Sequence, residues 1–316
     1  MPLILAIPSK GRLKEQAEDW LADCGLPVKL AGGERGYAAR LSGLPEIEVR
    51  LVSAGEIGAA LMAGDAHLGV TGEDVLRELT VELDAHVMLI QALGFGPADL
   101  VVAAPQSWID VDTMSDLDEV AHLYLARTGR RLRVATKYLN LTRAFFARHG
   151  IVDYRIVESS GATEGAPAAG VAELITDITT TGATLAANGL KILSDGLILS
   201  SQAQLAASLA ADWDIGTLDV ARRLARILEA RARAKATASL SWAPEADVLA
   251  RQAVAGLATG GANGHGALVA SGDVFTAADA LAAVGVGPVT IAEPSYVFAA
   301  KSDAIEALAR RLGVLN

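Results

Sequence analysis

The order of apolar and polar residues is the most restrictive feature of this 316-residue chain. Short apolar runs alternate with amphipathic stretches of helical period. The run LILAIP at 3–8 precedes a helical pattern that ends at Gly25, and the run at 133–136 precedes another that ends at Gly150. Strands that alternate with helices in this way are typical of largely parallel sheets. The pattern therefore predicts an α/β fold.

A longer amphipathic pattern at 217–236 separates this part from the rest of the chain. It carries arginines beside an apolar stripe, which is typical of a solvated linker helix, with an anion-binding helix as the alternative. We interpret residues 221–235 as a linker helix. Beyond it, residues 236–316 combine strand and helix patterns with the glycine-rich stretch TGGANGHG and no catalytic cluster. This region is predicted to be a small α+β domain.

The charge balance limits the ligands that the chain can bind. The formal net charge is -10 and the pI is near 5.0. Nucleic-acid-binding proteins carry a basic face, so we expect no nucleic-acid partner. A polyanionic ligand would be repelled at long range. It would have to be held by local devices: helix N-termini, backbone N–H groups, clustered Lys and Arg, or Mg²⁺.

The expected compartment follows from hydropathy and cysteine content. No apolar run approaches the ~18 residues that a membrane-spanning helix needs. The first residues lack the basic start and the cleavage site of a signal peptide. Cys24 is the only cysteine, which excludes an internal disulfide and favours the cytosol. We expect a cytoplasmic protein with no membrane partner.

The stretch DITTTGATL, residues 177–185, is the strongest local signal for a ligand. An acid at a strand end, a hydroxyl-rich turn and a helix beginning near Gly182 together suit a ribose 5-phosphate. Helix N-terminal N–H groups bind phosphate, and glycine permits close backbone approach. Asp177 suits the ribose hydroxyls. The alternative is an ordinary helix N-cap at Thr180 or Thr181. The sequence contains no Walker A loop and no dinucleotide-binding fingerprint.

The longer segment GATEGAPAAGVAELITDITTTGATLAANGL, residues 161–190, decides between these readings. It resembles the phosphoribosyl-pyrophosphate signature of the ATP phosphoribosyltransferase family, the first enzymes of histidine biosynthesis. Three further stretches resemble that family: IPSKGRL at 7–13, HLGVTGEDVL at 67–76 and ATKYLNLTRAFF at 135–146. The resemblance covers about residues 1–225 and is loose beyond them.

The resemblance implies a two-lobed, periplasmic-binding-protein-like catalytic part with the active site in the cleft between the lobes. The first lobe is expected at 1–95 and 193–220, the second at 96–192. It implies transfer of the phosphoribosyl group of phosphoribosyl pyrophosphate to N1 of ATP, with Mg²⁺ on the pyrophosphate. It also implies a homo-oligomer, dimer or hexamer, with histidine as an allosteric inhibitor bound by the C-terminal domain.

Site residues are carried over by position. The implied catalytic residues are Glu164, Asp177, Lys10 and Arg12, the carboxylates for the sugar and the cations for phosphates. The implied substrate-binding residues are Gly11, Arg35, Gly72, Glu73, Asp74, Lys137, Tyr138, Glu173 and Asp177, with Thr179, Thr180, Thr181, Gly182, Ala183 and Thr184 of the loop. No residue is nominated as a metal ligand or a general base.

Two positions depart from the family pattern. His67 stands where an aspartate is usual, and Ser53 stands where an arginine for pyrophosphate is usual. Arg50, three residues before Ser53, is the candidate replacement for that arginine. Two other functions remain as alternatives. One is a non-catalytic effector-binding module on the same two-lobed fold, and the other is a different phosphoribosyltransferase.

Overall fold

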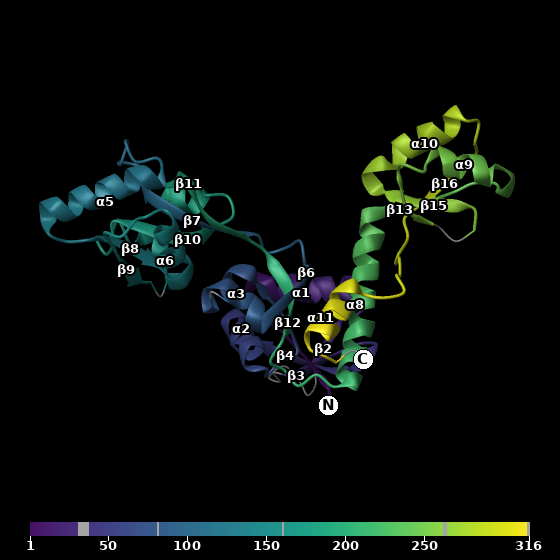
Figure 1. Cartoon of the computed structure of the whole chain (residues 1–316), viewed down its shortest axis with the longest axis horizontal. Coiled ribbons are helices and arrows are strands. Elements are labelled where there is room, and N and C mark those ends of the chain that lie inside the picture. The colour runs from purple at the N-terminus through teal and green to yellow at the C-terminus, as the bar shows by residue number, and fades with distance from the viewer. Residues whose placement is uncertain (31–37, 81, 160, 262–263, 315–316) are drawn as a thin grey trace.

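A computed structural model describes residues 1–30, 38–80, 82–159, 161–261 and 264–314. These residues form three sheets, each with its own apolar core. In Figure 1 the second sheet and its helices lie on the left, the first sheet lies in the centre, and the long helix α8 leads to the third sheet on the right. The predicted α/β fold, with a two-lobed part and a small additional domain, is confirmed.

The first sheet has the strand order β2-β3-β4-β1-β5-β12-β6. Its strands are β1 (Leu3–Pro8), β2 (Val28–Leu30), β3 (Ala38–Leu41), β4 (Leu44–Val52), β5 (Leu68–Gly72), β6 (Val87–Ala92) and β12 (Ala203–Ser208). Its helices are α1 (Gly11–Asp23), α2 (Ala54–Ala63), α3 (Glu73–Leu79) and α4 (Leu83–His86). Because β1 pairs in parallel with both β4 and β5, the helices that follow these strands all begin at one edge of the sheet.

The second sheet has the strand order β11-β7-β10-β8-β9. Its strands are β7 (Ala98–Pro105), β8 (Leu132–Thr136), β9 (Tyr154–Glu158), β10 (Leu174–Thr179) and β11 (Leu190–Ser201). Its helices are α5 (Met114–Thr128), α6 (Leu139–Arg148), the 3₁₀ turn η1 (Thr163–Gly165) and α7 (Ala183–Ala187). Both ends of β11, Leu190–Ile192 and Leu199–Ser201, pair with β7, so the chain returns to the first lobe at β12, near residue 203 and not at 193 as predicted.

Two crossings join the lobes, one between β6 and β7 and the other between β11 and β12. They are hydrogen-bonded to each other. The N–H of Ala203 donates to the carbonyl of Phe95 over 3.0 Å, and the N–H of Gly94 donates to Oε1 of Gln202 over 2.9 Å. This double connection holds the facing edges of the two sheets close together at the crossings.

The third sheet follows α8 (Ile215–Ala236), which begins and ends beyond the predicted linker. Its order is β14-β15-β13-β16, with α9 and α10 packed in its core, the arrangement of a βαββαβ unit. The elements are β13 (Thr237–Ser241), η2 (Pro244–Ala246), α9 (Asp247–Ala253), β14 (Ala258–Gly261), β15 (Gly266–Ala270), η3 (Ser271–Asp273), α10 (Val274–Ala283) and β16 (Thr290–Ala292).

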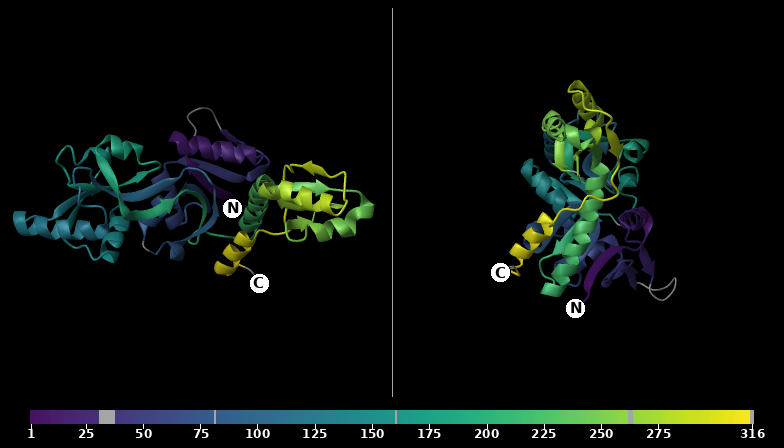
Figure 2. Two further views of the ribbon diagram at one scale, coloured as in Figure 1. Left: turned by 90° about the horizontal axis from the view of Figure 1, so that it is seen from above. Right: turned by 90° about the vertical axis from the view of Figure 1, so that its right-hand side faces the viewer.

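The last helix, α11 (Asp303–Arg311), does not belong to the C-terminal domain, contrary to the prediction. Ile305 and Leu308 are buried in the core of the first lobe, and Arg222 of α8 pairs with Glu306 at 2.9 Å. Figure 2 shows α11 beside α8 at that lobe. The helix has an apolar stripe at i, i+3 spacing, which predicts burial but not the surface that buries it.

No helix in the described ranges is long and apolar enough to cross a membrane.

Candidate active site

The threonine loop connects β10 to α7, as the sequence predicted. The N–H of Gly182 donates to Oγ1 of Thr179 at 2.8 Å, and the N–H of Ala183 donates to Oγ1 of Thr181 at 3.4 Å. Gly182 has φ +74°, a left-handed conformation that side chains disfavour. The hydroxyl of Thr180 reaches the carbonyl of Pro97 at 3.3 Å, which ties the loop to the interlobe crossing. The hydroxyls thus both cap the turn and line the space beside it.

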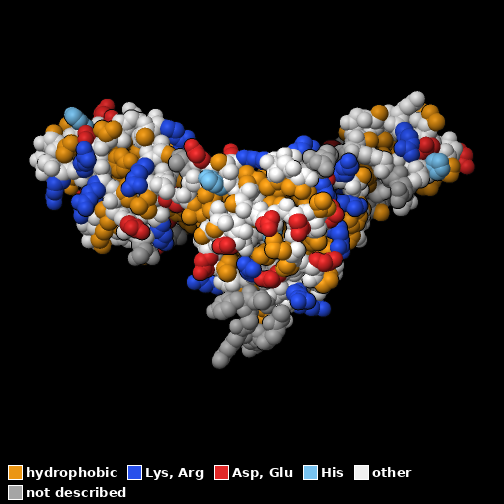
Figure 3. Space-filling model, turned by 60° about the horizontal axis from the view of Figure 1, so that its bottom comes forward, with side chains coloured by type: hydrophobic (Ala, Val, Ile, Leu, Met, Phe, Trp, Pro, Cys, Tyr) orange, Lys and Arg blue, Asp and Glu red, His pale blue; other side chains and the backbone are white. Residues whose placement is uncertain are grey.

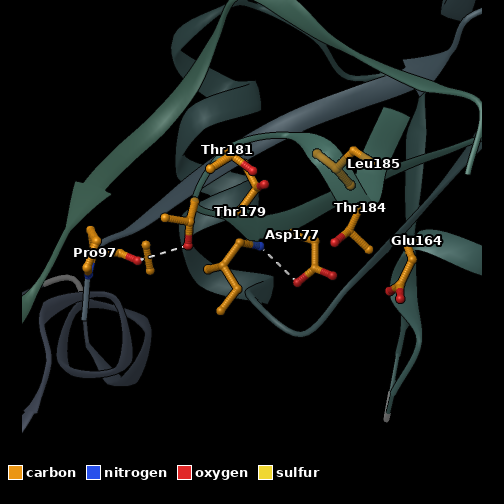
Figure 4. A pocket seen from close by; sticks show the side chains of 10 residues that line it. Pro97, Glu164, Asp177, Thr179, Thr181, Thr184 and Leu185 are labelled. Atoms are coloured by element: carbon orange, nitrogen blue, oxygen red, sulfur yellow. Dashed lines mark hydrogen bonds between the residues drawn. The ribbon is translucent and has the colours of Figure 1, made fainter. Parts of the chain in front are cut away.

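A pocket of about 360 Å³ opens beside this loop. It is lined by Pro97, Ala98, Glu164, Asp177, Ile178, Thr179, Thr180, Thr181, Thr184 and Leu185. Figure 4 shows the carboxylates of Asp177 and Glu164 with Thr184 between them; these three residues come from β10, η1 and α7. The structure therefore brings together Glu164, Asp177 and the threonines that the sequence analysis had grouped.

Asp177 is half-buried in this pocket. Burial is the largest influence on its carboxyl and raises the pKa above its ordinary value of 3.8. The N–H of Ile178, which donates to Oδ1 at 2.9 Å, and the nearby charge of Lys137 both lower the pKa, while Glu164 raises it. Glu164 and Lys137 thus lie close enough to influence Asp177. A pair of carboxylates beside one lysine is suited to stabilising positive charge on a bound sugar.

A second pocket, of about 300 Å³, extends from the first into the other lobe. It is lined by Arg12, Leu13, Gln16, Ala54, Gly72, Asp74, Val75 and Gly96, together with Pro97, Ala98, Ile178 and Thr180, which line the first pocket too. The shared residues make the two pockets one cleft across the crossing. Its walls on the first-lobe side come from the starts of α1, α2 and α3, at the carboxyl edge of β1, β4 and β5.

The start of α1 gives this part of the cleft a positive character. Lys10 is the N-cap residue and makes no side-chain cap, and no acid lies in the first turn. Gly11 has φ +74°, and Arg12 lines the pocket with no ion-pair partner in the described part of the chain. The free N–H groups and the two cations form the kind of local device that an acidic protein needs for an anion. Figure 3 shows basic and acidic side chains mixed over the face it presents, in keeping with local rather than long-range attraction.

Asp74 and Tyr138 hydrogen-bond to each other across the two lobes. Asp74, 5% exposed, accepts from the hydroxyl of Tyr138 at 2.8 Å and from that of Ser201 at 2.8 Å. Burial, followed by the charge of Asp74, raises the pKa of Tyr138 well above its usual range, so the phenol keeps its proton. A Cβ at position 72 would clash with Oδ1 of Asp74, so the glycine leaves the space that this carboxylate occupies. Substrate contacts of Asp74 and Tyr138 remain a prediction.

Two predicted substrate-binding acids have other partners. Glu173 lines neither pocket: it binds the Arg133 guanidinium at 2.7 Å and the Tyr124 hydroxyl at 3.2 Å. We reassign it to fixing the start of β10 against the neighbouring strand β8. Glu73 accepts from Arg77 at 2.6 Å and from Gln204 at 3.0 Å. Arg35 lies outside the described residues.

Comparison with known proteins identifies the family. A family model described as ATP phosphoribosyltransferase matches residues 53–229. An ATP phosphoribosyltransferase of Caulobacter vibrioides (strain NA1000 / CB15N) is 64% identical over 98% of both chains. The chain belongs to the ATP phosphoribosyltransferase family. The one from Rhodopseudomonas palustris (strain BisA53) is 59% identical over 74% of this chain and 72% of its own. A solved ATP phosphoribosyl transferase (HisG:HisZ) complex from Thermotoga maritima matches 65% of this chain and 86% of its own at 28% identity and TM-score 0.49. The family model and the Caulobacter relative confirm the predicted transferase activity.

The two departures from the ATP phosphoribosyltransferase pattern have structural explanations. His67 is buried: its Nδ1 accepts from the N–H of Ile4 at 3.1 Å, and its Nε2 lies 3.1 Å from the carbonyl of Asp212. Ser53 is the N-cap of α2 and forms a reciprocal capping box with Glu56. Both residues hold elements of the first lobe in place.

Arg50, the candidate replacement for the missing arginine, lines neither pocket. Its guanidinium binds Glu48 at 2.8 Å and the carbonyl of Asp65 at 3.1 Å. Asp65 follows the C-terminal end of α2, whereas the pocket residue Ala54 begins that helix. A ten-residue helix is about 15 Å long, so Arg50 is directed away from the cleft.

Several residues of this ATP phosphoribosyltransferase line the cleft although the sequence did not predict them. Pro97, Ala98, Leu13 and Gln16 line it. The pair Gly96-Pro97 is a turn signal between two predicted strands and marks the crossing. No sequence pattern marked Gln16, because a polar residue in an amphipathic helix is predicted to face solvent.

Proposed function

We propose that this chain joins N1 of the adenine of ATP to C1 of the phosphoribosyl group of phosphoribosyl pyrophosphate and releases pyrophosphate, the first step of histidine biosynthesis. The observation that carries the proposal is the continuous cleft. Its second-lobe half presents two carboxylates and a threonine loop, and its first-lobe half presents apolar walls and the guanidinium of Arg12. The two substrates match the two halves. Phosphoribosyl pyrophosphate is a phosphorylated sugar, which suits the carboxylates and the threonine loop, and ATP carries a flat base, which suits the apolar walls.

The sugar phosphate is assigned to the threonine loop. Hydroxyls of Thr181 and Thr184 line the pocket, and with the backbone around Gly182 they supply donors for the 5-phosphate. Asp177 and Glu164 accept from the ribose hydroxyls. As the bond from C1 to pyrophosphate breaks, positive charge develops on the sugar, and these carboxylates stabilise it.

ATP is assigned to the half of the cleft walled by the first lobe. Leu13 and Val75 provide apolar surface for the adenine, and Gln16 offers an amide donor and acceptor to its polar edge. Arg12 and Lys10, at the start of α1, hold phosphate groups. N1 of adenine is uncharged near neutral pH and attacks without first losing a proton, so positioning contributes most of the rate.

Mg²⁺ fits as a partner of the pyrophosphate. Within the described ranges no group of three or more His, Cys, Asp or Glu side chains could hold a metal ion by itself. Mg²⁺ typically keeps waters and binds substrate phosphates with one or two protein carboxylates, and Asp177 and Glu164 are the carboxylates at hand. When bound, it neutralises negative charge on the leaving group.

Regulation by histidine and assembly into a homo-oligomer are proposed on the resemblance to the family. A cavity of about 470 Å³ lies between the sheet of the C-terminal βαββαβ unit and the chain that follows β16, and is lined by Ser239, Gly261, Leu268, Pro294, Tyr296, Val297 and Phe298. This cavity is large enough for an amino acid. We expect millimolar histidine to inhibit noncompetitively with phosphoribosyl pyrophosphate, since the cavity is remote from the cleft.

The test is a direct assay with ATP, phosphoribosyl pyrophosphate and Mg²⁺, following the product by absorbance and pyrophosphate release in parallel. Asp177→Asn is expected to lower kcat about 100-fold, and Asp19→Asn, an exposed acid of α1, serves as the matched control. The ionised carboxylate of Asp177 is the form that stabilises the sugar, so kcat/KM should fall as the pH drops toward the pKa of Asp177. Because that pKa is raised, the fall should begin at a higher pH than for an ordinary aspartate. Folded protein that releases no pyrophosphate would instead support a non-catalytic effector-binding module.

A further inference from the structure

Helices α3 and α6 belong to different lobes, yet each forms hydrogen bonds with free backbone groups at one end of the other. The carboxylate of Glu78 on α3 accepts from the N–H groups of Asn140 at 2.8 Å and Leu141 at 3.0 Å, near the start of α6. In return, the side-chain amide of Asn140 donates to the carbonyl of Glu78 at 2.8 Å, near the end of α3. The free N–H groups at a helix start and the free carbonyls at a helix end are usually satisfied within their own segment.

The sequence of α6 makes this contact necessary. Its N-cap residue is Tyr138, which forms no side-chain cap, and its first turn contains no acid. An uncapped helix start attracts a negative group through its N–H groups and its dipole. Glu78 supplies that group from the other lobe. The start of α6 is therefore occupied by a carboxylate of this chain and is not open to a substrate phosphate.

A second interlobe contact lies one helical turn before the first. Asp74 and Glu78 are four residues apart on α3, so they share one face of the helix. Asp74 binds the hydroxyl of Tyr138, the residue that precedes α6, at 2.8 Å, and the hydroxyl of Ser201, at the end of β11, at 2.8 Å. One face of α3 thus holds the start of α6 and the end of the strand that enters the crossing.

This contact adjoins both halves of the cleft. Asp74 and Val75 of α3 line the half walled by the first lobe. Tyr138 follows Lys137, whose charge acts on Asp177 in the other half. A change in the angle between α3 and α6 would therefore change the distance between the two substrate-binding walls.

We propose that the reciprocal capping of α3 and α6 by Glu78 and Asn140, with the Asp74–Tyr138 hydrogen bond, is an interlobe latch that sets the separation of the two substrates. Glu78 and Asn140 are positioning residues: they line neither pocket and act through the helices that they join. The role assigned to them in turnover rests on the proposed placement of ATP and phosphoribosyl pyrophosphate in the two lobes. The latch itself is a property of the free protein.

The first measurement reads the lobe separation without substrates. Spin labels at Ala59→Cys on α2 and Ala147→Cys on α6, both exposed, report the interlobe distance in a Cys24→Ala background. Cys24 is 2% exposed, so its replacement by Ala changes no accessible thiol. We expect a narrow distance distribution, and a broader, longer one when Glu78→Ala or Asn140→Ala is added. An unchanged distribution in both variants would overturn the latch.

The second measurement separates positioning from stability. Glu78→Ala and Asn140→Ala should each lower kcat about tenfold, with the dissociation constant of each substrate changed less than about twofold, because each pocket wall stays intact. Glu78→Gln, which keeps one acceptor, should recover part of the loss. The control Glu119→Ala removes an exposed acid of α5. Normal kcat in the folded fraction, with only a lower melting temperature, would overturn the positioning role. If the distances respond but no variant or wild type turns over, the proposed function fails and the latch stands.

Discussion

Acid should destabilise the first lobe through His67. This side chain is 3% exposed and lies edge-on to Trp213, with ring centroids 4.9 Å apart. Nδ1 accepts from the N–H of Ile4, so the ring proton resides on Nε2 and is donated to the carbonyl of Asp212. Only the neutral ring satisfies both contacts, because a proton on Nδ1 would face the N–H of Ile4. Burial, the largest influence, lowers the pKa below the ordinary 6.5.

The sign and size of the effect follow from linkage. The folded pKa lies below the unfolded one, so the stabilisation is present above pH ~6.5 and is lost as the pH falls toward the folded value. Each pH unit below the unfolded pKa lowers the free energy of unfolding by at most about 1.4 kcal/mol. Between about pH 7 and about pH 5.5 the loss from this single group is at most about 1.3 kcal/mol.

Urea denaturation followed by tryptophan fluorescence measures this loss. His67→Gln is the matched variant, because a glutamine amide keeps a donor and an acceptor and does not titrate. The variant should be less stable at neutral pH by about 1–3 kcal/mol, the cost of disturbing buried hydrogen bonds. Between the two pH values it should lose less stability than the wild type, by up to about 1.3 kcal/mol, since all other groups titrate alike in both. Equal losses in the two proteins would refute the reasoning.

Three further substitutions test the site assignments. Gly182→Ala places a side chain at φ +74°, which should cost about 1–2 kcal/mol of stability and weaken phosphoribosyl pyrophosphate binding about tenfold by calorimetry; unchanged affinity would return the threonines to a capping role. Glu173→Gln should lower stability by about 1–2 kcal/mol in thermal unfolding with normal kcat, because its carboxylate binds Arg133, and a selective rise in KM would contradict the reassignment. Arg50→Ala should leave kcat of the folded enzyme unchanged, whereas a lower kcat at constant KM would restore it to the cleft.

The sequence alone determined the architecture and one half of the site. Apolar runs alternating with helical patterns specify an α/β chain, because periodicity follows directly from which face of each element is buried. The threonine loop was found because all its parts lie within nine consecutive residues, from Asp177 to Leu185. A phosphate site built on one strand–turn–helix needs no knowledge of the rest of the fold.

Only the tertiary structure decided which separate segments meet. The apolar stripe of α11 predicted burial, but its packing against α8 assigns it to the first lobe. Glu173 directly precedes β10 and Asp177 lies within it, yet the first contacts Arg133 and the second lines the cleft. From the sequence, Glu78 would be predicted to be a solvent-exposed acid of a helix. In the structure it caps α6 of the other lobe, where its partner Asn140 lies 62 positions later in the chain. Such assignments depend on partners distant in the chain, and local sequence patterns carry no information about what lies across an interface.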